Sequence, residues 1–417
     1  MFKIGIFPLI ATVFFSYYSS IAALPIIEDS TDSPTRGVVT LAYVLGFLLA
    51  PYVADHLKHV RRRNYLISSV LLVIFGVAIY PIAAYLTPAL CIIWLAISIV
   101  FISLGAVGFY VPALTLLLAH DPKNIYLLFP VAEFSWDLGY TFGLTMPLYL
   151  SEKEHFLFYF LSCTLLLALV FIFTLKYVKK TPREDDENLD LEIKDLIKEN
   201  EILLDCMVII FVVAAARCID PVLDGILEDS DRDDGTITIF IVGSSIVSFV
   251  VTGIFCLFLE KIDRKVIMLL GIIGAIIGLI LIGIVNTIIG EYNPCLLYGL
   301  IFLDFGMSVG TASGFPIITG TAMNKIGLKL TDRVVDLIAG IYVTAIMLGA
   351  ALGPAMMIWL TYYMEYYHAA IIWFGLGIIV AIIYIRHTWH GFVTLPRKQK
   401  ELEKEKLIKE EIQSDNN

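Results

Sequence analysis

The chain has 417 residues, of which 59% are hydrophobic, and its mean hydropathy is +0.84. These values exclude a soluble globular domain and predict an all-α polytopic membrane protein. The formal net charge of −10 decides little, because acidic and basic residues are segregated into different loops. The six cysteines lie in or beside apolar runs without metal-ligand spacing, so we expect neither a metal site nor a disulfide. No phosphate-binding loop or hydrolase motif occurs, which argues against an enzyme and a bound cofactor.

Apolar runs long enough to cross a bilayer, about 20 residues each, predict twelve transmembrane helices. The first is expected to be a retained helix rather than a cleaved signal peptide, because another span follows it at once. The predicted spans are 4–27, 36–54, 64–86, 89–119, 125–150, 155–177, 203–227, 236–259, 265–289, 295–323, 334–361 and 367–389. We therefore expect two six-helix bundles, 1–178 and 203–390, with a linker at 179–202 and a charged tail at 391–417.

The loop charges predict the orientation, because Lys and Arg accumulate on the cytosolic side of membrane proteins. Bases cluster in the loops between spans two and three, eight and nine, and ten and eleven, and after span six. The alternate loops are mainly acidic, as in the run from Glu228 to Asp234. Both termini are therefore expected in the cytosol. Apolar linker residues recur at near-helical spacing and predict a short amphipathic helix on the cytosolic face. They are Leu189, Ile193, Leu196 and Ile197.

The span at 203–227 is interrupted by two charges and a proline. Arg217 and Asp220 are three residues apart, so they share a face of a helix and can pair. Pro221 removes a backbone donor beside them and should bend the helix. A charge inside a span costs about 2.5–3.5 kcal/mol or more, so it normally faces a partner or a watery cavity. The pair is either a structural link to a neighbouring helix or, as we favour, a site where Asp220 handles a cation or proton.

Two acids in the fifth predicted span form a second candidate site. Glu133 and Asp137 are four residues apart on one helix face. Two carboxylates this close repel each other, which favours a proton on one of them. Trp136 beside them can contact an organic cation. The alternative is structural, with Glu133 hydrogen-bonded to a neighbouring helix and Asp137 paired with Arg217.

Two more acids lie in the C-terminal half. Asp304, in the tenth span, is either a site residue or a structural acid, and Asp336 begins the eleventh span, where a carboxylate stabilises a helix N-terminus. The inner acids together outnumber Arg217. A cavity lined by them would carry net negative charge, so we expect a cationic substrate.

The two halves repeat a glycine and proline pattern at corresponding spans. Span four contains it between Gly105 and Pro112, and span ten contains it between Gly310 and Pro316. Glycines four residues apart let neighbouring helices approach closely. Paired spans interrupted by Gly and Pro in two halves are typical of transporters with a central site.

On these features the chain resembles the major facilitator superfamily of transporters. Its eleventh span carries a glycine–proline run that resembles the motif which antiporters of this superfamily usually have on the fifth helix. The run is Gly340-x8-Gly349-x3-Gly353-Pro354. The resemblance implies the twelve-helix major facilitator fold of two pseudo-symmetric bundles.

Two loops resemble the acidic-then-basic loop signature of the superfamily. One leads from Asp55 to Arg61, and the second copy leads from Glu260 to Arg264. Such a loop can latch one half to the other through ion pairs that break when the halves rock. Ordinary positive-inside charge would explain the bases of these loops but not their acids.

Within the superfamily, the run from Ile219 to Leu223 resembles the seventh-helix Leu-acid-Pro motif of the vesicular amine transporters, including their polyamine-carrying branch. That resemblance implies that Asp220 handles an amine in exchange for protons. The chain differs from those relatives in several places, among them a first helix without an acid and a short first lumenal loop without glycosylation sites. Its fourth helix is uncharged from Trp94 to Phe101, where many carry Arg, and it has Thr311 near where amine carriers have Asp.

We therefore expect a monomeric secondary transporter that exchanges protons for an organic cation, such as a polyamine-like amine. The roles we expect are Asp220 as cation or proton site, Glu133 and Asp137 as coupling carboxylates, and Arg217 as their partner. We expect the protein in the lipid bilayer of an intracellular vesicle, an endosome or the plasma membrane, without nucleic-acid partners. Two alternatives stay open: facilitated transport of a neutral or anionic metabolite, and a non-transporting receptor or scaffold on a transporter fold.

Overall fold

The computed structural model describes most of residues 46–120, all of 153–178, 190–223, 262–285 and 293–388, and a few single positions elsewhere. Within these ranges the regular structure is entirely helical. Eight helices in them are long and apolar enough to cross a membrane, and each coincides with a predicted span to within a few residues. The predicted spans 4–27, 125–150 and 236–259 lie wholly or largely outside the described residues, as does most of 36–54.

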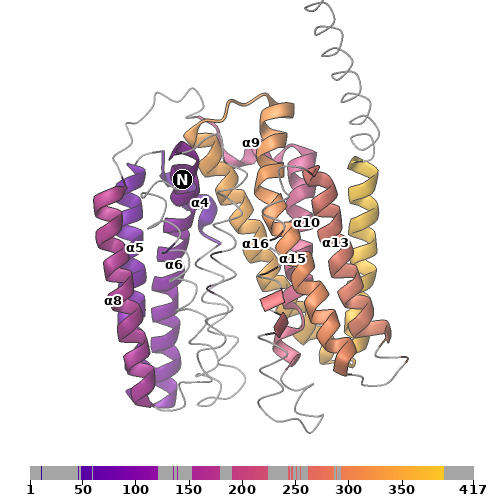
Figure 1. The fold of residues 1–417 in the computed structure, drawn as a ribbon, viewed down its shortest axis with the longest axis horizontal. Helices are drawn as coiled ribbons and strands as arrows, with labels where there is room; N and C mark the ends of the chain where they lie inside the picture. The colour runs from indigo at the N-terminus through magenta and orange to yellow at the C-terminus, as the bar shows by residue number, and fades with distance from the viewer. Residues whose placement is uncertain are drawn as a thin grey trace, which may run out of the picture.

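The helices of the N-terminal half lie together on one side of the molecule (Figure 1). They are α4 (Ala50–His56), α5 (Arg62–Ile79) with the 3₁₀ turn η1 (Tyr80–Tyr85), α6 (Pro88–His120) and α8 (Lys153–Tyr177). Their outward side chains are large and apolar: Phe158 and Leu165 on α8 are 70% and 64% exposed. Such surfaces suit lipid rather than water, in agreement with the predicted membrane class.

The helices of the C-terminal half gather on the other side, and a short helix of the linker lies at one end between the halves (Figure 1). They are α10 (Asn200–Arg217), α13 (Arg264–Ile280) with the π-helical turn η4 (Leu281–Val285), α15 (Asn293–Thr321) with η5 (Ala322–Ile326), α16 (Asp332–Thr361) and a last span, Tyr366–Thr388. The linker helix is α9 (Ile193–Ile197). We call the end of the molecule beside α9, where α5, α10, α13 and α16 begin, the linker end.

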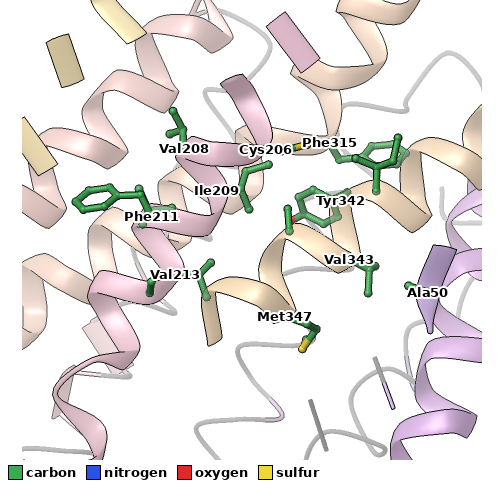
Figure 2. Close-up of a cluster of buried hydrophobic side chains, with 14 of the residues drawn as sticks. Ala50, Cys206, Val208, Ile209, Phe211, Val213, Phe315, Tyr342, Val343 and Met347 are labelled. Atoms are coloured by element: carbon green, nitrogen blue, oxygen red, sulfur yellow. The ribbon is translucent and has the colours of Figure 1, made fainter. Parts of the chain in front are cut away.

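Glycines let these helices approach closely, as their spacing predicted. A Cβ atom on Gly105 of α6 would lie 2.7 Å from the backbone of α5, and one on Gly349 of α16 would lie 2.6 Å from the Ile210 carbonyl oxygen of α10. On α15, a Cβ atom at Gly306 would lie 2.6 Å from the backbone nitrogen of Ala275 in α13. Figure 2 shows the buried core that results where α10 and α16 pack together. The small residues therefore set the helix spacing inside each half.

The span that contains α10 is bent where the sequence places Pro221. The α-helix ends at Arg217, Cys218 and Ile219 form a bend, and a helical turn resumes from Asp220 to Leu223. The break places Asp220 just beyond the end of the regular helix. This confirms the predicted interruption.

Candidate transport site and the contacts between the halves

The Arg217–Asp220 pair is present in the structure. Arg217 Nη1 lies 3.5 Å from Asp220 Oδ2, and the two side chains are 15% and 45% exposed. The predicted pairing across one helix turn is therefore confirmed. The unequal exposure shows that the arginine is held inside the protein while the carboxylate remains accessible.

Asp304 of α15 belongs to the same electrostatic cluster. Its side chain is hydrogen-bonded to Ser244 and interacts with the charge of Arg217. The partly buried Asp304 thus lies where a helix of the C-terminal half faces the broken end of α10. We call Arg217, Asp220 and Asp304 the charge cluster. The three side chains together have one more negative than positive charge when both acids are ionised.

The other predicted members of the site are not placed by the structure. Glu133, Trp136 and Asp137 lie outside the described residues. The pairing of Asp137 with Arg217 and the coupling role of the two acids therefore stay predictions. In the part of the chain that the structure describes, no group of three or more His, Cys, Asp or Glu side chains could hold a metal ion.

A second set of charges joins the two halves at the linker end. Arg333 of α16 donates from Nη1 to the carbonyl oxygen of Ala54 at 2.8 Å and from Nη2 to Asp55 Oδ1 at 2.9 Å. Lys58 also donates to Asp55, at 3.1 Å. Burial raises the pKa of Asp55, but the hydrogen bonds and charges of Arg333 and Lys58 outweigh it and hold that pKa below its ordinary value of 3.8. The predicted latch acid therefore contacts the opposite half as an ionised group.

Arg62, at the start of α5, makes another polar contact between the halves. Its guanidinium lies 3.0 Å from Asp332 and 2.6 Å from Asp336, both on α16. Thr115 of α6 donates to the other oxygen of Asp336 at 2.5 Å. Asp336 is completely buried. An acid that we had expected only to stabilise a helix N-terminus thus receives donors from two helices of the other half.

Some of these residues were missed by reasoning from sequence. The loop signature indicated Arg61, which is exposed and precedes the first turn of α5, while its neighbour Arg62 reaches α16. Adjacent residues of a helix point in directions about 100° apart, so only one of the two arginines can face α16. The sequence did not fix the start of α5 to within one residue and therefore could not tell which of them it is. Arg333 and Thr115 carried no local signal, because their partners are 278 and 221 residues away along the chain.

The glycines of the eleventh-span motif have two different surroundings. A Cβ atom on Gly340 would lie 2.8 Å from the Cβ atom of Ala54 and 3.2 Å from the Ala50 carbonyl oxygen, both on α4. Figure 2 shows Ala50 on the part of α4 that approaches α16. Gly349 and Gly353 instead meet α10. The motif therefore permits close contact between the halves at one point and within the C-terminal half at two others.

The described bases at the second copy of the loop signature contact residues of their own, C-terminal half. Arg264, at the start of α13, donates to the Pro316 carbonyl oxygen of α15 at 3.3 Å, and Lys265 lies 3.7 Å from Glu201 of α10. Lys325 of η5 also pairs with Glu201. These contacts join the linker ends of α10, α13 and η5. Glu260, the acid predicted for this loop, lies outside the described residues.

Apolar spans in two halves, a charge cluster at a broken helix and ion pairs between the halves are features expected of a secondary membrane transporter. Residues 6–335 match the family described as the Major Facilitator Superfamily. The chain belongs to this superfamily and has its fold, as the sequence predicted.

The fold is similar to that of a solved relative. The crystal structure of the human organic anion transporter MFSD10 (TETRAN) superimposes with a TM-score of 0.68 over 91% of this chain and 99% of that one, at 13% identity. At this identity the likeness shows the fold alone. A search among curated proteins finds no significant match.

Proposed function

We propose that the chain is a secondary active transporter that exchanges an organic cation for protons by alternating access. The observation that carries the proposal is the charge cluster, in which the partly buried Arg217 faces two carboxylates. A site with surplus negative charge inside a membrane protein attracts cations and disfavours anions.

Each member of the charge cluster has a separate role in this proposal. Arg217 holds Asp220 in position from the buried side. Asp220, with a side chain that is 45% exposed, presents a carboxylate oxygen to the amine. Asp304 supplies the second negative charge from α15. Glu133 and Asp137 are proposed as the acids that carry the exchanged proton, and Trp136 as an aromatic contact for the cation.

The contacts at the linker end support the alternating-access part of the proposal. Arg62 and Arg333 bind across the halves, so this end is held shut in the described conformation. We propose that the linker end faces the cytosol, in accordance with the loop charges. Transport then requires these ion pairs to break as the halves rock.

A second candidate is facilitated transport of an organic anion. Arg217 is mostly buried and is the group of the charge cluster that could bind a carboxylate or sulfonate. The fold neighbour named above is described as an organic anion transporter. In this case Asp220 would orient Arg217 rather than touch the substrate.

Ligand-dependent thermal stabilisation of the purified chain separates the two candidates. Polyamines and aromatic monoamines would be compared with organic dicarboxylates and sulfonates. We expect cations to stabilise the wild type and Asp220→Asn to weaken that binding about tenfold or more, because a charged hydrogen bond is lost. Glu365→Gln, which changes an exposed acid beyond α16, is the matched control and should bind normally. Stabilisation by anions that disappears in Arg217→Gln would favour the second candidate, and cation binding unchanged in Asp220→Asn would refute the first.

A further inference from the structure

The linker between the halves contributes directly to the contacts at the linker end. The same Arg333 nitrogen that binds Asp55, Nη2, also donates to the carbonyl oxygen of Leu191 in the linker, at 2.8 Å. Nη1 donates to the Ala54 carbonyl oxygen. One guanidinium on α16 therefore joins the linker to the N-terminal half.

The surroundings of Arg333 leave its guanidinium little freedom. Its side chain is 3% exposed, and the N–H donors of its planar guanidinium point in fixed directions. Two of its acceptors are backbone carbonyls, of Ala54 and Leu191, whose positions are set by the chain path rather than by a rotamer. A shift of Leu191 would deprive the buried Arg333 Nη2 of its carbonyl acceptor and allow the guanidinium to turn away from Asp55.

The described part of the linker packs against the C-terminal half through α9. Leu196, near the end of α9, is completely buried, and α9 packs against α10 and α16. Leu191 and Ile193 pack partly buried against the same core. The α9 turn is closed at its start by a hydrogen bond from the Glu192 backbone N–H to the Asp195 carboxylate, at 3.3 Å. The next residue, Ile197, is 40% exposed and does not share this anchoring role.

We infer that the linker is a positioning element for the contact between the halves: the burial of Leu196 holds the Leu191 carbonyl against Arg333 and thereby directs Arg333 toward Asp55 and Ala54. Because α9 is packed on the C-terminal half, Arg333 keeps its contact with Leu191 when the halves separate. Of the contacts that Arg333 makes, only those to Ala54 and Asp55 then break. The inference goes beyond the proposed function, since it concerns the closed conformation whatever the substrate is.

The test measures the distance between the halves at the linker end of the full chain in lipid nanodiscs. Spin labels are attached at Asn64 of α5 and Met323 of η5, which are exposed and lie in opposite halves, in a background without reactive native cysteines. We expect Leu196→Ala to raise the ratio of open to closed molecules about three- to tenfold, the effect of losing one hydrogen bond. Ile197→Ala, the matched control on the exposed face of α9, should leave the ratio unchanged.

A double-mutant comparison shows whether the linker acts through Arg333. Arg333→Gln alone should open the linker end, and adding Leu196→Ala should change the ratio no further. A purely structural role of Leu196 would lower the melting temperature without this dependence on Arg333. Equal shifts by Leu196→Ala in both backgrounds would overturn the inference.

A second variant covers the case in which Leu196→Ala does not fold. Two glycines inserted between Glu192 and Ile193 keep Leu196 in the chain to pack as before but release the Leu191 carbonyl from its position. This insertion should open the linker end as Leu196→Ala does, and again not in the Arg333→Gln background. An unchanged distance distribution in the insertion variant would also overturn the inference.

Discussion

Two carboxylates on described membrane helices, Asp336 and Asp220, have different surroundings, and these suggest different roles. Asp336 is completely buried and receives donors from Arg62 and Thr115. Asp220 is 45% exposed and lies 3.5 Å from Arg217 on its own helix turn. A fully coordinated acid stabilises one conformation, whereas an accessible acid can exchange a partner for a ligand.

Asp336→Asn tests the first of these roles. The amide keeps the shape but loses the charge that Arg62 binds, so we expect the closed conformation to lose about 1–3 kcal/mol. The open fraction should rise in distance measurements between the halves, while cation binding by Asp220 should still be detectable. Glu365→Gln, which changes an exposed acid beyond α16, is the control. An unchanged open fraction in Asp336→Asn would show that this acid does not hold the halves together.

Asp55 gives a prediction about pH. Its folded-state pKa lies below the ordinary value of 3.8, so its contribution to closure is fully present above that value and is lost as the pH falls through the lower folded pKa. We therefore expect the Asp55–Arg333 contact to be constant between about pH 5 and pH 8. Distance measurements across the linker end at several pH values check this. Opening with a midpoint near neutrality that disappears in Asp55→Asn would contradict it.

At the scale of elements, the spans were predictable and the contacts between them were not. A membrane helix must bury about 20 apolar residues regardless of its neighbours, so α5, α6, α10 and α16 appear in the sequence as continuous runs. The break at Pro221 and the pairing of Arg217 with Asp220 are also local and were predicted. The contact of Arg62 with Asp336 joins residues 274 positions apart, and nothing in a single sequence specifies it.

The glycine motif of α16 provides a packing test at this scale. A methyl group at position 353 would press against the backbone of Ala214 in α10, so Gly353→Ala should lower the free energy of unfolding by about 1–3 kcal/mol. Gly375→Ala, in the last span, has nothing within 4 Å of the added carbon and should be neutral or slightly stabilising. Thermal unfolding in detergent compares the two variants. Equal melting temperatures would show that α10 and α16 need no glycine at this point.

For the whole molecule, the structure combines two devices that reasoning from the sequence treated separately. The charge cluster lies at the broken end of α10, and the ion pairs of Arg62 and Arg333 lie at the linker end. In the proposed mechanism the first would bind the substrate and the second would close the linker end. Helix α16 connects the two regions because it packs against α10 as well as α4 and α6. The family and fold followed from the sequence pattern, because apolar runs and loop charges are local features of the chain.

Flux into proteoliposomes tests the central claim most directly. Uptake of radiolabelled polyamines and amines would be measured with and without an imposed proton gradient, for the wild type, Asp220→Asn and the control Glu365→Gln. We predict accumulation that follows the gradient in the wild type and the control and is abolished in Asp220→Asn. Uptake that ignores the gradient, or gradient-driven uptake that survives in Asp220→Asn, would contradict proton-coupled cation exchange at the charge cluster.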